Sequence, residues 1–120
     1  MQHGANAYGA VAKQIANPRE LEASLLLKAA SRLQAISDRW DGKRHELDDA
    51  LLFNRKLWTV FLTAATQGEH PLPQPVRQNV ANLGLFVMKQ TIAVLHEPRP
   101  EKLGALININ REIAAGLMGR

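Results

Sequence analysis

The chain has 120 residues, 46% of them hydrophobic and 22% charged, which is the composition of a folded protein and excludes a wholly disordered one. Its net charge of +4 is spread along the sequence, and without any cysteine it can form no disulfide, thiolate metal site or cysteine nucleophile. We find neither a signal peptide nor the roughly 20 apolar residues that cross a membrane, so we expect a cytoplasmic protein with no membrane insertion.

The first predicted element is a short helix over residues 4–16. Tyr8, Val11 and Ile15 recur at spacings of three and four, which gives this helix one apolar stripe. Two glycines weaken it, so the segment needs a surface on which to dock. We interpret residues 1–16 as a detachable arm over a partner groove, with Tyr8 as a candidate partner contact. The alternative is a helix that stays packed on the rest of the chain.

A helix predicted from residue 17 to about residue 40 has the clearest start signal. Asn17 can cap free backbone amides, Pro18 suits the first helical position, and Glu20 can complete a capping box. The pair Asp41-Gly42 indicates a turn or helix end. One continuous apolar seam is formed by Leu26, Ala29, Leu33, Ile36 and Trp40.

The next predicted helix covers roughly residues 44–66 and has two adjacent apolar seams, which is typical of a central helix. The first seam consists of Leu47, Leu51, Asn54, Trp58, Phe61 and Ala65. The second consists of Ala50, Phe53, Leu57, Val60 and Ala64.

Prolines separate the last two predicted helices from the others. Residues 68–75 form an extended linker with proline at alternate positions, and a helix over about 75–96 follows. Its inward positions are Val76, Val80, Leu83, Val87, Thr91 and either Val94 or Leu95. The last helix, about 100–118, is predicted to bury Leu103, Leu106, Ile107, Asn110, Ile113, Ala114 and Leu117.

The predicted fold is therefore all-α. No segment shows the sustained alternation of a β-strand. We expect one domain over residues 1–120, a bundle-like core of four principal helices over 17–118 and the short N-terminal helix before it.

Two Asn-Arg pairs stand inside apolar helical patterns, Asn54-Arg55 and Asn110-Arg111. Asparagine is unfavourable inside a helix because its amide competes for backbone hydrogen bonds. All four residues are candidate partner contacts, the arginines as clamps on a partner's carboxylates or backbone. The alternatives are a buried amide contact that fixes helix register and arginine ion pairs within the chain.

A family resemblance rests on several stretches that follow one another along nearly the whole chain. They are Ala7-Tyr8-Gly9-Ala10, Asn17-Pro18-Arg19-Glu20-Leu21-Glu22-Ala23, Asn54-Arg55-Lys56-Leu57-Trp58, Leu72-Pro73, Val76-Arg77, Asn82-Leu83 and the segment 106–117. Together they resemble the FlaF family of flagellar biosynthesis regulators.

This resemblance implies a non-catalytic cytoplasmic factor that binds flagellin before export and promotes its synthesis and secretion. It also implies action alongside FlbT, which restrains flagellin production through the messenger RNA. Trp58 and Phe61, one helical turn apart, would anchor a flagellin helix. The alternative for both aromatic residues is ordinary core packing.

Other functions remain as alternatives. One is direct binding to flagellin messenger RNA, although the balanced charge argues against it, and we expect no direct nucleic-acid contact. Another is an adaptor that works mainly through FlbT. The four histidines lack metal-ligand spacing, and no phosphate-binding loop or serine-nucleophile motif is present. We therefore expect no metal, no cofactor and no enzymatic activity.

Overall fold

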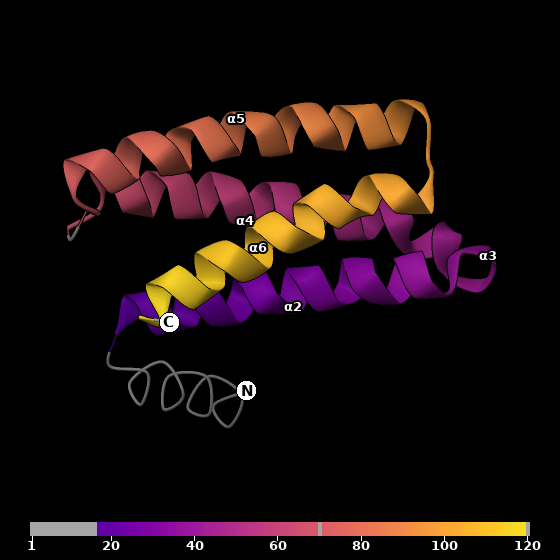
Figure 1. Ribbon diagram of the computed structural model, residues 1–120, viewed down its shortest axis with the longest axis horizontal. Helices are drawn as coiled ribbons and strands as arrows, with labels where there is room; N and C mark the ends of the chain where they lie inside the picture. The colour runs from indigo at the N-terminus through magenta and orange to yellow at the C-terminus, as the bar shows by residue number, and fades with distance from the viewer. Residues whose placement is uncertain (1–16, 70, 120) are drawn as a thin grey trace, which may run out of the picture.

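The computed structural model describes residues 17–69 and 71–119, and within these ranges the regular structure is entirely helical, as predicted (Figure 1). The elements are α2 (Pro18–Asp38), α3 (Trp40–Lys43), the 3-10 turn η1 (Arg44–Glu46), α4 (Leu47–Gln67), α5 (Gln74–His96), the 3-10 turn η2 (Pro100–Leu103) and α6 (Gly104–Leu117). No helix of this described part is long and apolar enough to cross a membrane.

The four long helices run antiparallel to their neighbours in sequence. Helices α2, α4 and α5 lie side by side, and α6 crosses diagonally over α2 and α4 (Figure 1). Helix α6 packs closely on α2, whereas α5 packs chiefly on α4 and meets α6 and η2 only sparingly. The arrangement is therefore a bundle in which one helix, α5, lies at the edge.

Helix α2 begins as its sequence predicts. The Asn17 side-chain oxygen accepts a hydrogen bond from the backbone N–H of Arg19 at 2.9 Å, which satisfies one of the free amides of the first turn. The helix stops at Asp38, two residues early, because Arg39 leaves helical geometry with φ −125° and ψ 46°. Trp40 therefore opens α3, and the Arg44 guanidinium lies 5.4 Å from the centre of its ring.

Helix α4 is central, and its first predicted seam is buried at all six positions. It starts at Leu47 because residues 44–46 form the 3-10 turn η1. The second seam is covered only in part, and the prediction that Val60 faces inward is wrong, since 67% of it is exposed. Val60 precedes Phe61 by one position, which turns it about 100° away from the buried seam.

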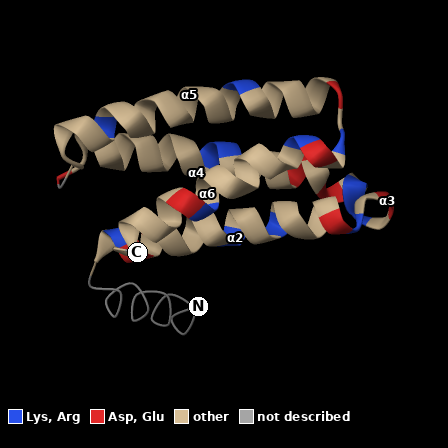
Figure 2. Cartoon of the chain, in the orientation of Figure 1, with Lys and Arg blue, Asp and Glu red and all other residues tan. Residues whose placement is uncertain are grey.

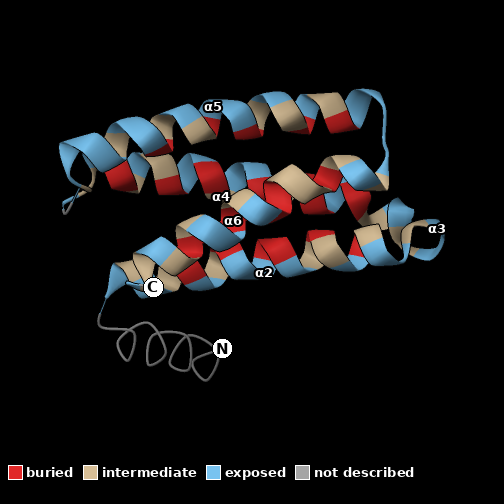
Figure 3. Ribbon diagram, viewed as in Figure 1, coloured by how far each residue is buried: buried red, intermediate tan, exposed pale blue. Residues whose placement is uncertain are grey.

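Helix α5 buries Val80, Gly84, Val87, Thr91 and Val94 against its neighbours (Figure 3). Val94 rather than Leu95 is thus the inward residue of that pair. The prediction that Val76 is inward is wrong, because it lies in the first turn of α5, at the end of the hairpin where α4 offers little cover.

The α4–α5 hairpin depends on close approach at Gly84. A Cβ atom at Gly84 would lie 2.6 Å from Cδ1 of Leu62, so the missing side chain lets α5 sit tightly against α4. The turn between the helices is closed by a hydrogen bond from the Leu72 N–H to the Ala65 carbonyl, at 2.8 Å. These two contacts fix α5 on one side of the bundle.

Helix α6 follows its predicted pattern. It begins at Gly104, because residues 100–103 form η2, where Leu103 is buried. In α6, Ile113 and Leu117 are half-buried, and the buried residues are Leu106, Ile107, Asn110 and Ala114. The junction to α5 is held by Gln90, whose side-chain amide donates to the Lys102 carbonyl at 2.9 Å.

Candidate functional site

The two asparagines of the Asn-Arg pairs meet each other in the core, together with Trp58. The indole N–H of Trp58 donates to Oδ1 of Asn110 at 2.8 Å. Nδ2 of Asn110 donates to Oδ1 of Asn54 at 2.7 Å and to the Leu26 carbonyl at 3.3 Å. This buried amide network (Asn54, Trp58 and Asn110) therefore links α2, α4 and α6.

One polar atom of the network has no hydrogen bond among the described residues. Nδ2 of Asn54 is buried and has no hydrogen-bond partner among the described residues. Its amide cannot simply be turned over, because Oδ1 must face the N–H groups of Asn110. The chain of bonds from Trp58 thus fixes both amide orientations and leaves Asn54 with the unpaired donor.

Four predicted partner contacts consequently lie inside the molecule: Asn54, Trp58, Phe61 and Asn110 are each at most 1% exposed. The rings of Trp58 and Phe61 pack edge to face with centroids 5.4 Å apart. Their burial agrees with the alternative interpretation, internal packing. Direct contact of these four residues with a partner stays a prediction, and it would require the core to open.

The two arginines behave differently from their asparagine neighbours. Arg55 and Arg111 are exposed, one on α4 and one on α6. Neither forms an ion pair within the described ranges, so the internal pairing considered for them is not seen there. Both are placed where a partner could reach them. Tyr8 lies outside the described residues, and its role stays a prediction.

Apart from Val60 on α4, the most exposed large apolar side chains among the described residues lie on α5. Ile92 is 67% exposed and Leu85 is 62% exposed, and Phe86 and Leu95 are exposed by more than two-fifths. Leu85 and Ile92 are seven residues apart and so lie on one stripe of the helix, two turns apart. We call these four residues the α5 outer face.

Few charged residues precede this face in the sequence, although the exposed Lys89 lies between Leu85 and Ile92 on the same side of α5. Between Lys56 and Lys89 the sequence contains just two charged residues, Glu69 and Arg77. Figure 2 shows the contrast, since α5 is almost free of blue and red while charges gather around α3 and the adjoining helix ends. Depletion of charge around large apolar side chains is typical of the centre of a protein–protein interface. This low-charge stretch includes Leu85 and Phe86 and ends at Lys89, so it is a sequence signal for the first half of the α5 outer face.

Histidine and acidic side chains are dispersed among the described residues. Within them, no group of three or more histidine, aspartate or glutamate side chains is placed to hold a metal ion. The polar side chains of the core are engaged in packing and hydrogen bonding instead of lining a cavity.

Comparison with protein-family models gives a match over almost the whole chain. The family model described as flagellar protein FlaF matches residues 4–117, which is almost the whole chain. No curated protein and no solved structure matches this chain significantly. The match extends from the N-terminal segment to the end of α6, and on this ground the chain belongs to the FlaF family of flagellar proteins.

Proposed function

We propose that this protein is a cytoplasmic flagellin-binding chaperone that promotes flagellin synthesis and secretion. Unassembled flagellin has long amphipathic terminal segments that tend to aggregate. A helical protein can shield such a segment by pairing an apolar face with the apolar stripe of the segment. Family membership and the surface chemistry of α5 support this role.

The observation that carries the proposal is the α5 outer face. Buried residues of α5 already hold the helix on α4, so Leu85 and Ile92 are not needed for the core. Covering large apolar side chains with a partner is favourable by about 25 cal/mol per Å² of apolar surface removed from water. Because α5 lies at the edge of the bundle, a partner helix can lie along it without displacing another helix.

A binding measurement with purified flagellin tests this proposal. We expect the Leu85→Gln/Ile92→Gln variant to bind flagellin about tenfold more weakly or worse, because two central apolar contacts are lost. The matched control is Leu27→Gln/Leu52→Gln, which changes two other exposed leucines, on α2 and α4. The control should bind like the parent protein.

Truncated flagellins and FlbT complete the test. Binding should persist with flagellin that lacks one terminal segment and vanish with flagellin that lacks the other. Unchanged affinity in the α5 variant would refute the α5 outer face as the flagellin site. Binding to FlbT with no binding to any flagellin would refute the chaperone role and favour an adaptor.

A further inference from the structure

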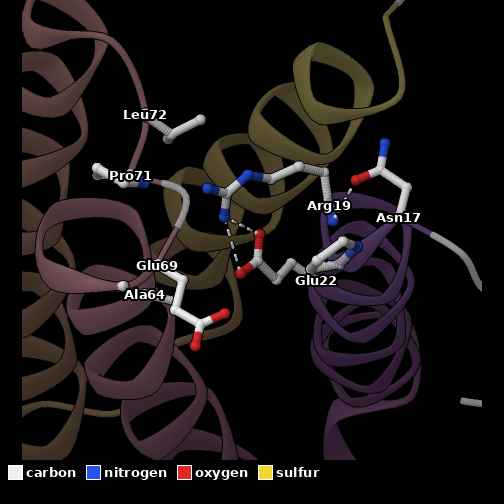
Figure 4. A pocket seen from close by; sticks show the side chains of 9 residues that line it. Asn17, Arg19, Glu22, Ala64, Glu69, Pro71 and Leu72 are labelled. Atoms are coloured by element: carbon white, nitrogen blue, oxygen red, sulfur yellow. Dashed lines mark hydrogen bonds and ion pairs between the residues drawn. The ribbon is translucent and has the colours of Figure 1, made fainter.

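A hollow lined by described residues lies at the opposite end of α2 from α3, away from the α5 outer face. It has a volume of about 560 Å³ and lies between the first turn of α2 and the end of α4 with the loop that follows (Figure 4). Its lining residues are Asn17, Pro18, Arg19, Glu22, Ala64, Gly68, Glu69, Pro71 and Leu72. We call it the α2–α4 pocket.

The pocket has an apolar wall and a polar wall. Ala64, Pro71 and Leu72 supply apolar surface from the α4 side. On the α2 side, Arg19 donates to both carboxylate oxygens of Glu22, at 2.7 and 3.0 Å, and both side chains are less than one-fifth exposed. A hollow of this kind suits a polypeptide segment that has several apolar side chains and few charged ones.

We propose that residues 1–16 of this same chain occupy the α2–α4 pocket. Asn17 lines the pocket and is pinned there by its hydrogen bond to Arg19, so the preceding chain must start at the pocket rim. Ile15 comes two residues earlier and so has its Cα within about 7 Å of that of Asn17. Val11 and Tyr8 precede it at spacings of four and three, so a helical segment would present all three on one side.

The covalent link between residues 1–16 and Asn17 favours this segment over a separate molecule as the occupant of the pocket. A segment joined directly to the pocket rim is present at an effective concentration of about millimolar or more. A second copy or another protein would have to outcompete it from far lower concentrations. The charges of the segment and the pocket are also complementary. The segment contains one basic residue of the lysine and arginine type, Lys13, and no acidic residue, whereas the pocket lining contains two acidic residues, Glu22 and Glu69, and one basic residue, Arg19.

The absence of native cysteine allows a direct test by disulfide trapping in the full chain. One variant carries Ile15→Cys and Ala64→Cys, and the control carries Ile15→Cys and Thr63→Cys. Thr63 is exposed, adjoins Ala64 on α4 and does not line the pocket. Circular dichroism establishes that both variants fold.

We expect the Ala64 pair to form an intramolecular disulfide at least about tenfold faster than the Thr63 pair, because only the docked segment holds two sulfurs within bonding geometry. Equal rates would overturn the proposal. A disulfide between two molecules would overturn it in favour of a second copy as the occupant.

Proteolysis gives a second, independent measurement. Trypsin cleaves after Lys13, and protection of that bond follows the fraction of molecules with the segment docked. Ala64→Arg places a charged side chain in the pocket and should raise the cleavage rate after Lys13 several-fold. Thr63→Arg, with the same charge on the neighbouring position, should leave the rate unchanged. Equal effects of both substitutions would contradict the proposal, and neither measurement depends on flagellin binding.

Discussion

The indole N–H of Trp58 on α4 reaches across the core to Oδ1 of Asn110 on α6, at 2.8 Å. The two residues are 52 positions apart in sequence and both are 0% exposed. A buried hydrogen bond of this kind ties the relative height of two helices to one geometry, because sliding either helix would leave a donor and an acceptor unpaired. Asn110 is therefore the residue on which the packing of three helices depends.

Replacing Asn110 should destabilise the protein strongly. Asn110→Ala leaves the Trp58 N–H and Oδ1 of Asn54 buried without partners, at about 1–3 kcal/mol each, so we expect a loss of about 2–6 kcal/mol. Asn108→Ala, on an exposed position of the same helix, should change stability by less than about 0.5 kcal/mol. Urea unfolding followed by tryptophan fluorescence measures both. A small effect for Asn110→Ala would mean that the network contributes little.

The two asparagines should not be equivalent. Asn54→Leu removes the unpaired Nδ2 donor along with one hydrogen bond, whereas Asn110→Leu breaks three. We expect Asn54→Leu to be less destabilising than Asn110→Leu by about 1–2 kcal/mol. The double variant should fall short of the sum of the single effects, because both residues belong to one network. Equal and additive losses in a double-mutant cycle would contradict this account.

Two glycine substitutions should act in opposite directions. A Cβ atom at Gly68 would lie 2.5 Å from the Ala64 carbonyl oxygen, a backbone atom that cannot rotate away, so Gly68→Ala should cost about 1–3 kcal/mol. Nothing lies within 4 Å of a Cβ at Gly116, which is inside α6, so Gly116→Ala should stabilise by up to about 1 kcal/mol. Thermal unfolding should show a lower Tm for the first and a higher Tm for the second. An unchanged or higher Tm for Gly68→Ala would exclude the steric explanation at Gly68.

Salt dependence should distinguish flagellin binding from binding to RNA. Contact through the α5 outer face is apolar, so raising salt from about 50 to about 200 mM should change the affinity for flagellin less than about threefold. A protein that held RNA through many phosphate contacts would lose affinity by orders of magnitude over that range. Fluorescence anisotropy with labelled flagellin and labelled RNA makes the comparison. Tight, strongly salt-dependent RNA binding would favour the alternative function, a regulator that binds flagellin messenger RNA directly.

Periodicity in the sequence predicts burial well where a helix has neighbours on several sides. All six residues of the first seam of α4 are buried for this reason. The errors at Val60 and Val76 arise because a valine's burial depends on a neighbour that the local pattern cannot reveal. Likewise, the meeting of Asn54 with Asn110 depends on how α4 and α6 are brought together.

The exposure of the α5 outer face is not predicted by the sequence pattern, for a related reason. Helix α5 has apolar residues on both sides, Val87 facing α4 and Leu85 facing outward, so its pattern does not say which side remains open. Charge depletion between Lys56 and Lys89 was the available signal, and it points to a surface only when the edge position of α5 is known.

The edge position of α5 also predicts that α5 is locally less stable than the α2–α6 pair. Since α5 packs chiefly on α4, we expect it to detach by local unfolding while α2 and α6 remain packed on each other. Its amide protons are therefore expected to exchange with deuterium sooner than those of α2. The helix that carries the α5 outer face would then also be the first to loosen, which gives a bound polypeptide a route of release that leaves the rest of the fold intact.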